Sequence, residues 1–135
     1  MGKMLIYTDG GSRGNPGRAA IGAVIGNKKY GELIGIATNN IAEYKAVIFA
    51  LKKAKQLLGK EKSGETELEM NMDSELVYKQ LTGQYKLKEE SLWPLFIEIW
   101  NTKQEFKKVE FFHVLREKNR EADKLVNQAL DGILI

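Results

Sequence analysis

The feature that most constrains this chain is a change in its hydrophobic period near residue 40. Before that point, short apolar runs alternate with glycine, and most of the thirteen glycines lie before residue 36. After it, apolar residues recur every three or four positions, as they do on one face of a helix. The sequence therefore predicts a β-rich first third and a mainly helical remainder.

Three strands are predicted in the first third, over residues 4–9, 20–26 and 30–38. Segment 10–17 is rich in glycine and contains Pro16, so we expect it to be the turn that ends the first strand. Residues 27–29 are short enough to connect a hairpin. The expected arrangement is a three-stranded antiparallel meander.

Beyond residue 40, helices alternate with two further strands. The predicted helices cover residues 40–59, 73–81, 91–103 and 119–130, and the strands cover residues 66–72 and 109–114. Asn40 and Ser91 are good candidates for helix caps. Because strands separated by such helices pair in parallel, we expect an α/β fold with a mixed five-stranded sheet, three antiparallel strands plus parallel ones, and helices on both faces. Helices on one face only are the alternative.

Composition limits the size of the protein and its chemistry. The 135 residues have the length of one domain, so residues 1–135 are expected to form a single unit. With no cysteine, a metal ion would need oxygen ligands or the single histidine, His113. No apolar segment resembles a membrane span or a signal peptide, so we expect a cytoplasmic protein that does not contact membranes. The net charge of +3 permits a polyanionic partner without requiring one.

Four carboxylates lie where predicted strands end or predicted helices begin: Asp9, Glu43, Asp73 and Asp123. Such positions meet at one edge of an α/β sheet. Grouped carboxylates repel one another unless a cation is present, and Mg²⁺ prefers oxygen ligands. Two such ions support the hydrolysis of a phosphodiester. Each acid also has a purely structural explanation, as a cap, a first-turn charge or a turn residue.

Four segments that contain these acids are similar, in order and spacing, to segments of the type 1 ribonuclease H family. They are residues 7–17 (YTDGGSRGNPG), 38–43 (TNNIAE), 72–74 (MDS) and 119–123 (NREAD). The first is very specific and the second is specific in combination, whereas the two short aspartate contexts would be weak alone. Together the segments extend the resemblance over nearly the whole chain.

The resemblance implies a metal-dependent hydrolase, an endonuclease that cuts the RNA strand of RNA/DNA hybrids and leaves 5′-phosphate and 3′-hydroxyl ends. It implies two Mg²⁺ ions, with Mn²⁺ as a substitute, and no small-molecule cofactor. By the same resemblance Asp9 would bridge both ions, Glu43 and Asp73 would complete the shell of one, and Asp123 that of the other. We expect a monomer that binds a hybrid duplex.

The resemblance also points to residues that contact the hybrid. They are Gly10, Gly11, Ser12, Asn15, Thr38, Asn39, Asn40 and Ser74. Small residues after the first acid would allow close approach to RNA 2′-hydroxyls, the asparagines would reach across the minor groove, and the threonine would contact a DNA-strand phosphate. An A-form-like duplex is read in this way, through its minor groove and 2′-hydroxyls. Turn formation and helix capping are the competing roles of these residues.

The chain departs from the family near the last acid. Many members carry a histidine in a loop there, but His113 lies in a predicted strand. Our hypothesis is that Arg116, in the loop itself, contacts a phosphate instead, because a guanidinium stays protonated and binds phosphate well. The alternative is a solvated loop cation.

A second departure concerns the basic, tryptophan-rich handle of some bacterial members, which is absent here. Lys79, Lys86 and Lys88 are expected either to follow the DNA backbone or to form a solvated helix face. Trp93 and Trp100, seven residues apart, predict an apolar stripe that packs in the core.

Two other functions remain open at this level. A duplex-binding module without turnover is disfavoured because all four acids are present. A DNA-directed nuclease of the same fold is disfavoured because segments 10–12 and 38–40 match the parts of the family that read hybrids.

Overall fold

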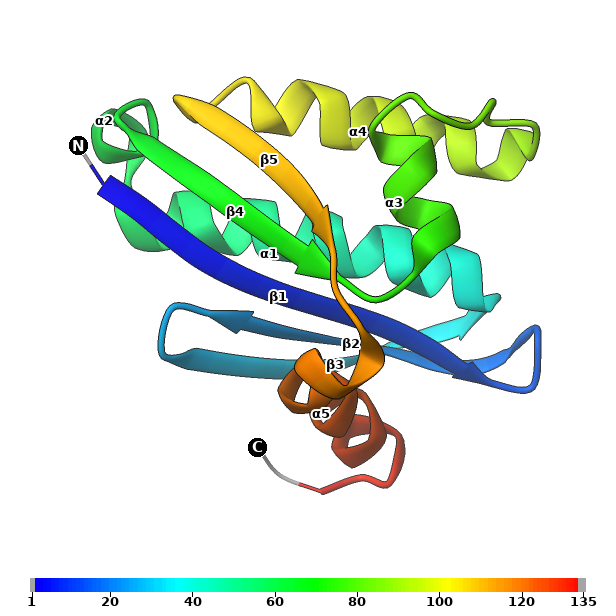
Figure 1. Ribbon diagram of the computed structural model, residues 1–135. Coiled ribbons are helices and arrows are strands. Elements are labelled where there is room, and N and C mark those ends of the chain that lie inside the picture. Colours follow the sequence, from blue (N-terminus) through cyan, green and yellow to red (C-terminus); the bar gives the residue numbers. More distant parts are fainter. Residues whose placement is uncertain (1, 134–135) are drawn as a thin grey trace.

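Five strands form one mixed sheet across the centre of the molecule (Figure 1). The computed structural model describes residues 2–133. The strands are β1 (Gly2–Arg13), β2 (Gly17–Ile25), β3 (Lys28–Ala37), β4 (Thr66–Met72) and β5 (Lys108–His113), in the spatial order β3-β2-β1-β4-β5. The first three are antiparallel, whereas β4 is parallel to β1 and β5 is parallel to β4. The predicted mixed sheet is confirmed.

Helices cover both faces of this sheet, as predicted, so the one-sided alternative is wrong. They are α1 (Asn39–Leu58), α2 (Lys60–Ser63), α3 (Glu75–Leu81), α4 (Trp93–Lys103) and α5 (Arg120–Leu130), with 3₁₀ turns at Glu90–Leu92 and Arg116–Lys118. In Figure 1, α1 and α4 lie on one side of the sheet and α5 on the other. Strand β2 is almost entirely buried because α1 and α5 pack against its two faces.

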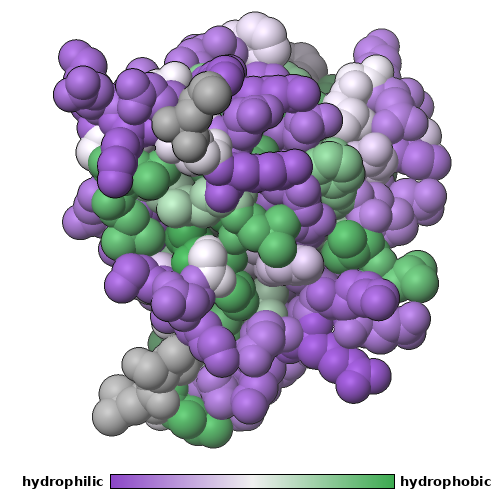
Figure 2. Space-filling view, turned by 60° about the vertical axis from the view of Figure 1, so that its left-hand side comes forward, coloured by the Kyte–Doolittle hydropathy of each residue, from purple (hydrophilic) through white to green (hydrophobic). Residues whose placement is uncertain are grey.

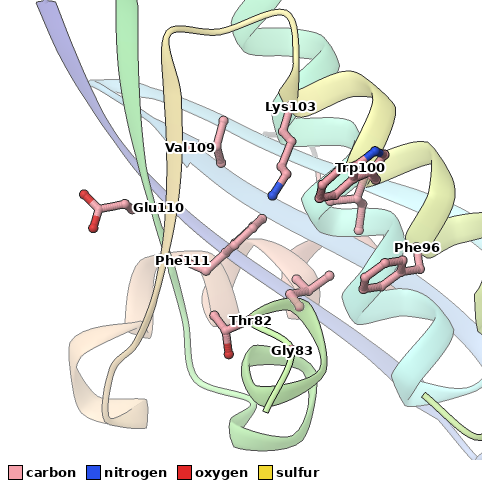
Figure 3. Close-up of a pocket in the computed structure, with 10 residues that line it drawn as sticks. Thr82, Gly83, Phe96, Trp100, Lys103, Val109, Glu110 and Phe111 are labelled. Atoms are coloured by element: carbon pink, nitrogen blue, oxygen red, sulfur yellow. The ribbon is translucent and has the colours of Figure 1, made fainter. Parts of the chain in front are cut away.

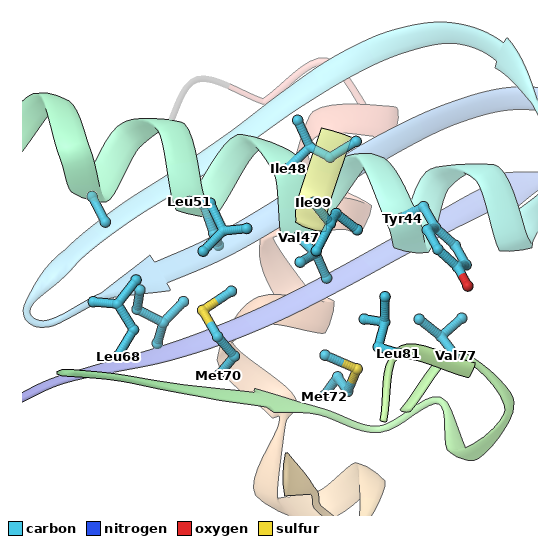
Figure 4. Packing of buried hydrophobic residues seen from close by; sticks show 14 of the residues in the cluster. Tyr44, Val47, Ile48, Leu51, Leu68, Met70, Met72, Val77, Leu81 and Ile99 are labelled. Carbon is cyan, nitrogen blue, oxygen red and sulfur yellow. The ribbon is translucent and has the colours of Figure 1, made fainter. Parts of the chain in front are cut away.

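The larger core lies between α1 and the sheet (Figure 4). The predicted apolar stripe of α1 is buried there, with Tyr44, Val47 and Leu51 at most 1% exposed. Strand β4 contributes Leu68 and Met70 to the same cluster. Burying one leucine of this size contributes about 1.5–3 kcal/mol to stability, so α1 is anchored firmly against the strands.

The expectation that segment 10–17 is a turn was wrong for its first residues. Strand β1 continues through Gly10 and Gly11, which pair with β2 opposite Ile21 and Ala20. A Cβ atom on Gly10 would lie 2.3 Å from the backbone carbonyl of Ala42 in α1. Glycine is therefore needed because a helix crosses the strand closely, a long-range reason that local sequence does not reveal.

Two of the expected helix caps were also wrong. Thr38, rather than Asn40, caps α1, and its hydroxyl accepts a hydrogen bond from the Ile41 N–H at 3.2 Å. Ser91 lies within a 3₁₀ turn, and its hydroxyl donates to the carboxylate of Glu89 instead of capping α4. Each of the four expected helices begins one or two residues from the position expected, and α2 is an additional short helix between α1 and β4.

The prediction that the two tryptophans pack in the core was wrong. Trp93 is 47% exposed and Trp100 is 54% exposed, because α4 turns Ile99 toward the core instead. Lys103 lies over the Trp100 ring, 4.6 Å from its centroid. Helical spacing identified one apolar stripe, but α4 carries apolar residues on more than one side.

Exposed apolar residues are not confined to α4. Figure 2 shows the side that lies to the left in Figure 1, where a patch of hydrophobic residues crosses the middle of the face and hydrophilic residues surround it. Within residues 2–133, no helix combines the length and the apolar character needed to cross a bilayer.

Candidate active site

The four acids come from four different elements. Asp9 lies in the central strand β1, and Asp73 directly follows its neighbour β4. Glu43 lies near the start of α1 and Asp123 near the start of α5. One carboxylate oxygen from each of Asp9, Glu43 and Asp73 can be chosen so that all three lie within 4.8 Å of one another. Asp123 lines the same groove as these three acids, and its charge is among the causes that raise the pKa of Asp9.

Glu43 is held in place by the backbone of β1. The N–H of Gly10 donates a short hydrogen bond to Glu43 Oε1. This contact is possible because Gly10 has no side chain, so the first turn of α1 can approach the strand. The glycine after the first acid thus fixes the position of the second.

Burial and mutual repulsion raise the pKa values of two acids in this cluster. Burial raises the pKa of Asp9 from 3.8 to about 7, helped by the charges of Asp73 and Asp123, while a hydrogen bond with Glu43 acts in the opposite direction. Burial, followed by the charge of Asp9, raises the pKa of Glu43 well above its usual value. A divalent cation would relieve both effects, and the donor set consists of oxygen alone, as Mg²⁺ or Mn²⁺ requires. The residues present therefore fit a divalent metal.

A buried asparagine is hydrogen-bonded to two of the acids and to the residue before a third, and the sequence analysis gave it no role. Asn119 is 1% exposed, and its Nδ2 donates to the Thr8 carbonyl at 2.9 Å and to Asp73 Oδ2 at 3.3 Å. Its own carbonyl accepts from the Asp123 N–H at 3.1 Å, in the first turn of α5. Asn119 Oδ1 has no hydrogen-bond partner within the described chain. Its place in the NREAD segment was the only available signal.

A groove of about 390 Å³ surrounds the acids. All four of them line it, together with the predicted residues Gly10, Gly11, Ser12, Asn39, Asn40, Ser74 and Arg116. Two predicted residues, Asn15 and Thr38, do not line it. Four residues that were not predicted do line it: Arg13, Val126, Asn127 and Leu130.

The asparagines beside the groove hold one another in place. The Ser12 N–H donates to Asn39 Oδ1 at 2.8 Å, and the Asn39 N–H donates to Asn15 Oδ1 at 2.9 Å. Asn15 therefore helps to hold Asn39 in place at the groove wall. In the described part of the chain, the side-chain NH₂ groups of both asparagines make no hydrogen bond and remain available as donors.

His113 and Arg116 occupy different places, as the sequence suggested. His113 ends strand β5 and stacks on Tyr78, with ring centroids 5.9 Å apart, and it does not line the acidic groove. Arg116 begins the 3₁₀ turn before α5 and does line the groove.

A second cavity, of about 500 Å³, lies between α3, α4 and the edge strand β5 (Figure 3). Phe96, Trp100, Val109 and Phe111 give it a largely apolar lining. None of the four acids lines it, so it is separate from the candidate active site.

The comparison with known proteins first gives a class. Residues 7–129 match the family model described as reverse transcriptase-like. The chain is 39% identical over 136 residues to ribonuclease HI of Halobacterium salinarum, a match that covers 96% of this chain and 65% of that protein. It is 38% identical over 137 residues to a bifunctional protein of Mycobacterium tuberculosis, covering 96% of this chain and 36% of that protein. The chain thus spans about a third of the length of this mycobacterial relative.

Solved structures similar to this chain indicate the type of ribonuclease H. A type 1 ribonuclease H isolated from compost is 46% identical, with a TM-score of 0.90 and 98% of each chain covered. Its complex with an RNA/DNA hybrid is 45% identical, with a TM-score of 0.89, and the match covers 96% of this chain and 97% of that one. The chain belongs to the ribonuclease H family, type 1.

Proposed function

We propose that this protein is an endonuclease that hydrolyses the RNA strand of RNA/DNA hybrids and leaves 5′-phosphate and 3′-hydroxyl ends. The observation that carries the proposal is the meeting of Asp9, Glu43 and Asp73 within 4.8 Å, in the fold of a type 1 ribonuclease H. A relative 45% identical to this chain has been crystallised with an RNA/DNA hybrid, which supports the choice of substrate.

In this proposal Asp9 would be shared by two Mg²⁺ ions, Glu43 and Asp73 would complete the shell of one, and Asp123 that of the other. When bound, such a pair activates a water molecule and stabilises the leaving oxygen of an in-line phosphoryl displacement. Mn²⁺ would replace Mg²⁺ because both accept oxygen ligands in an octahedral arrangement.

The groove residues would position the hybrid. Gly11 and Ser12 line the wall beside Asp9, where their small size would let an RNA strand approach the backbone. The free NH₂ groups of Asn15 and Asn39 would donate to sugar hydroxyls and base edges of the minor groove. Thr38 uses its hydroxyl oxygen to cap α1 and keeps its hydroxyl proton for a phosphate of the DNA strand. Asn40 and Ser74, which also line the groove, complete the proposed contacts.

Arg116 is proposed to contact the phosphate near the cut. It lines the groove with the acids, and no side chain among the described residues is paired with it. A guanidinium remains charged at neutral pH and forms bidentate hydrogen bonds to phosphate, so its role would be electrostatic rather than proton transfer.

A single assay tests the proposal. The protein is incubated with a hybrid labelled on the RNA strand, with Mg²⁺, with Mn²⁺ or with EDTA, and the products are sized and tested for 5′-phosphate. We expect metal-dependent cutting within the strand, abolished in Asp9→Asn. A protein that binds the hybrid without cutting it would be a binding module, and one that cuts an all-DNA duplex equally well would be a DNA nuclease; either result contradicts the proposal.

A further inference from the structure

A second, more open groove continues from the acidic site over the start of α5. Its volume is about 570 Å³, and it is lined by Arg116, Glu117, Arg120, Asp123 and Lys124. Arg116 and Asp123 also line the acidic groove, so the two grooves share a border. A ligand held over the acids would therefore extend into this region.

The side chains that line this second groove comprise three cations and two acids, so they carry a net positive charge. Arg120 and Lys124 are four residues apart on α5, so they lie on one side of the helix, the side that also carries Asp123. Both are exposed, and neither forms an ion pair or hydrogen bond with any side chain of residues 2–133. The acid next to Arg120 in the sequence, Glu121, pairs instead with Lys29 of β3 at 3.2 Å.

The direction of α5 places these cations at one end of the combined groove. The other end of the helix is tied to the β1–β2 hairpin, where Arg13 pairs with Asp131 at 2.6 Å. Ser12 and Asn39 line the acidic groove near that hairpin. A strand that passes from Ser12 over the acids therefore reaches Arg120 and Lys124 last.

The chemistry of this end fits phosphodiester groups. Unpaired cations on an exposed helix attract polyanions, and arginine binds phosphate oxygens through a planar fork of donors. Four helical residues span about 6 Å along the axis, which is comparable to the rise of about two nucleotides at 3.4 Å each. By this measure Arg120 and Lys124 are spaced to contact backbone phosphates about two nucleotides apart.

We propose that Arg120 and Lys124 bind backbone phosphates of the RNA strand adjacent to the cut, on the side of the acids that faces away from the β1–β2 hairpin. This inference rests on the proposed function, because it names a further contact for the same substrate. Neither residue touches the reacting atoms, so the pair sets affinity and register rather than the chemical step.

The test is the double variant Arg120→Ala/Lys124→Ala, matched by Lys60→Ala/Lys62→Ala. Lys60 and Lys62 are exposed residues of α2, which lies far from α5 in Figure 1, and their loss changes the net charge equally. Binding of the hybrid is measured by fluorescence anisotropy in Ca²⁺, over a range of salt concentrations, and cleavage is measured in Mg²⁺. Melting temperatures confirm that both variants fold.

We expect the α5 variant to bind several-fold more weakly and to lower the slope of log Kd against log salt by about two, one for each lost phosphate contact. Its KM should rise while kcat stays within about twofold of the unmodified protein. The α2 variant should behave like the unmodified protein. Equal effects of the two variants would mean a general charge effect and would overturn the inference.

Shortened hybrids locate the contact. When the RNA is trimmed close to the cut on one side, the difference between the α5 variant and the unmodified protein should disappear, and trimming the other side should preserve it. If the difference persists whichever side is trimmed, the inference is overturned. Failure of the unmodified protein to cut the hybrid at all would instead contradict the proposed function, so the two failures are distinguishable.

Discussion

Two neighbouring residues of α1, Glu43 and Tyr44, belong to regions with opposite energetics. Tyr44 is fully buried in the apolar core, and its hydroxyl donates to Gln80 Oε1 at 2.8 Å. Glu43 faces the acidic cluster, where burial and the charge of Asp9 raise its pKa. Burial of apolar groups stabilises the core, whereas the acidic cluster gathers carboxylates that repel one another. The rigid core beneath α1 is what keeps the acids together.

The largest expected effect comes from Glu43→Gln, which removes a charge while keeping an oxygen for the Gly10 N–H. Because even residues that only orient metal ligands typically contribute 10–100-fold, we expect hybrid cleavage to fall by at least about 100-fold. Without metal, the melting temperature should rise, since repulsion is relieved. The matched variant Tyr44→Phe should retain cleavage. Its unfolding free energy should fall by about 1 kcal/mol, because Gln80 loses its hydrogen-bond donor. A lower melting temperature for Glu43→Gln would contradict the comparison.

The second effect concerns the core alone. Leu51→Ala should cost about 2–5 kcal/mol of unfolding free energy, because Leu51 is fully buried and the cavity relaxes only partly. Chemical denaturation measures the loss. At temperatures well below melting, cleavage per folded molecule should remain close to that of the unmodified protein. A specific loss of kcat would show that the apolar core and the acidic cluster are not separate.

Gly10→Ala tests the contact that joins the two regions. The added Cβ would meet the Ala42 carbonyl at 2.3 Å, so α1 must move away from β1 and carry Glu43 with it. We expect a stability loss of about 1–3 kcal/mol together with a fall in cleavage. Gly2→Ala is the control, because a Cβ there meets nothing within 4 Å. Similar results for both variants would refute the role assigned to Gly10.

The acidic region should also give the protein a distinctive pH dependence in the absence of metal. The pKa of Asp9 is raised from 3.8 to about 7 in the folded state, so folding takes up a proton between these values. Its contribution to stability is fully present below pH 3.8 and is lost as the pH rises through 7. In EDTA, the gain in melting temperature of Asp9→Asn over the unmodified protein should therefore be larger at pH 8 than at pH 5. Equal gains for Asp9→Asn at pH 5 and pH 8 would contradict a raised pKa of Asp9. Mg²⁺ should also raise the melting temperature of the unmodified protein at pH 8.

The smallest effect should come from an aromatic residue outside both regions. Trp100→Gln is expected to change the unfolding free energy by less than about 1 kcal/mol, because the side chain is 54% exposed. Thermal denaturation checks this value. A cost similar to that of Leu51→Ala would place Trp100 functionally within the core.

The sequence predicted those features that depend on local pattern. Strands, the long stripe of α1 and the crossover order follow from hydrophobic period, and the four motif segments contain the acids that line one groove. The errors concern contacts between distant segments. Gly10 looks like a turn residue until α1 is packed against it, and no local pattern shows which side of α4 faces the core. Asn119 was similarly visible as part of a motif, but its bonds to Thr8 and Asp73 exist only in the folded chain.

The order in which the acids occur along the chain has a consequence for protein synthesis. Asp9 lies on the first strand, which is also the central one, whereas Asp123 lies on the last helix. A nascent chain leaving the ribosome therefore presents its central strand long before β4, β5 and α5 are available to flank it. The four carboxylates can assemble only after α5 has emerged, so a partially translated chain lacks a complete cluster.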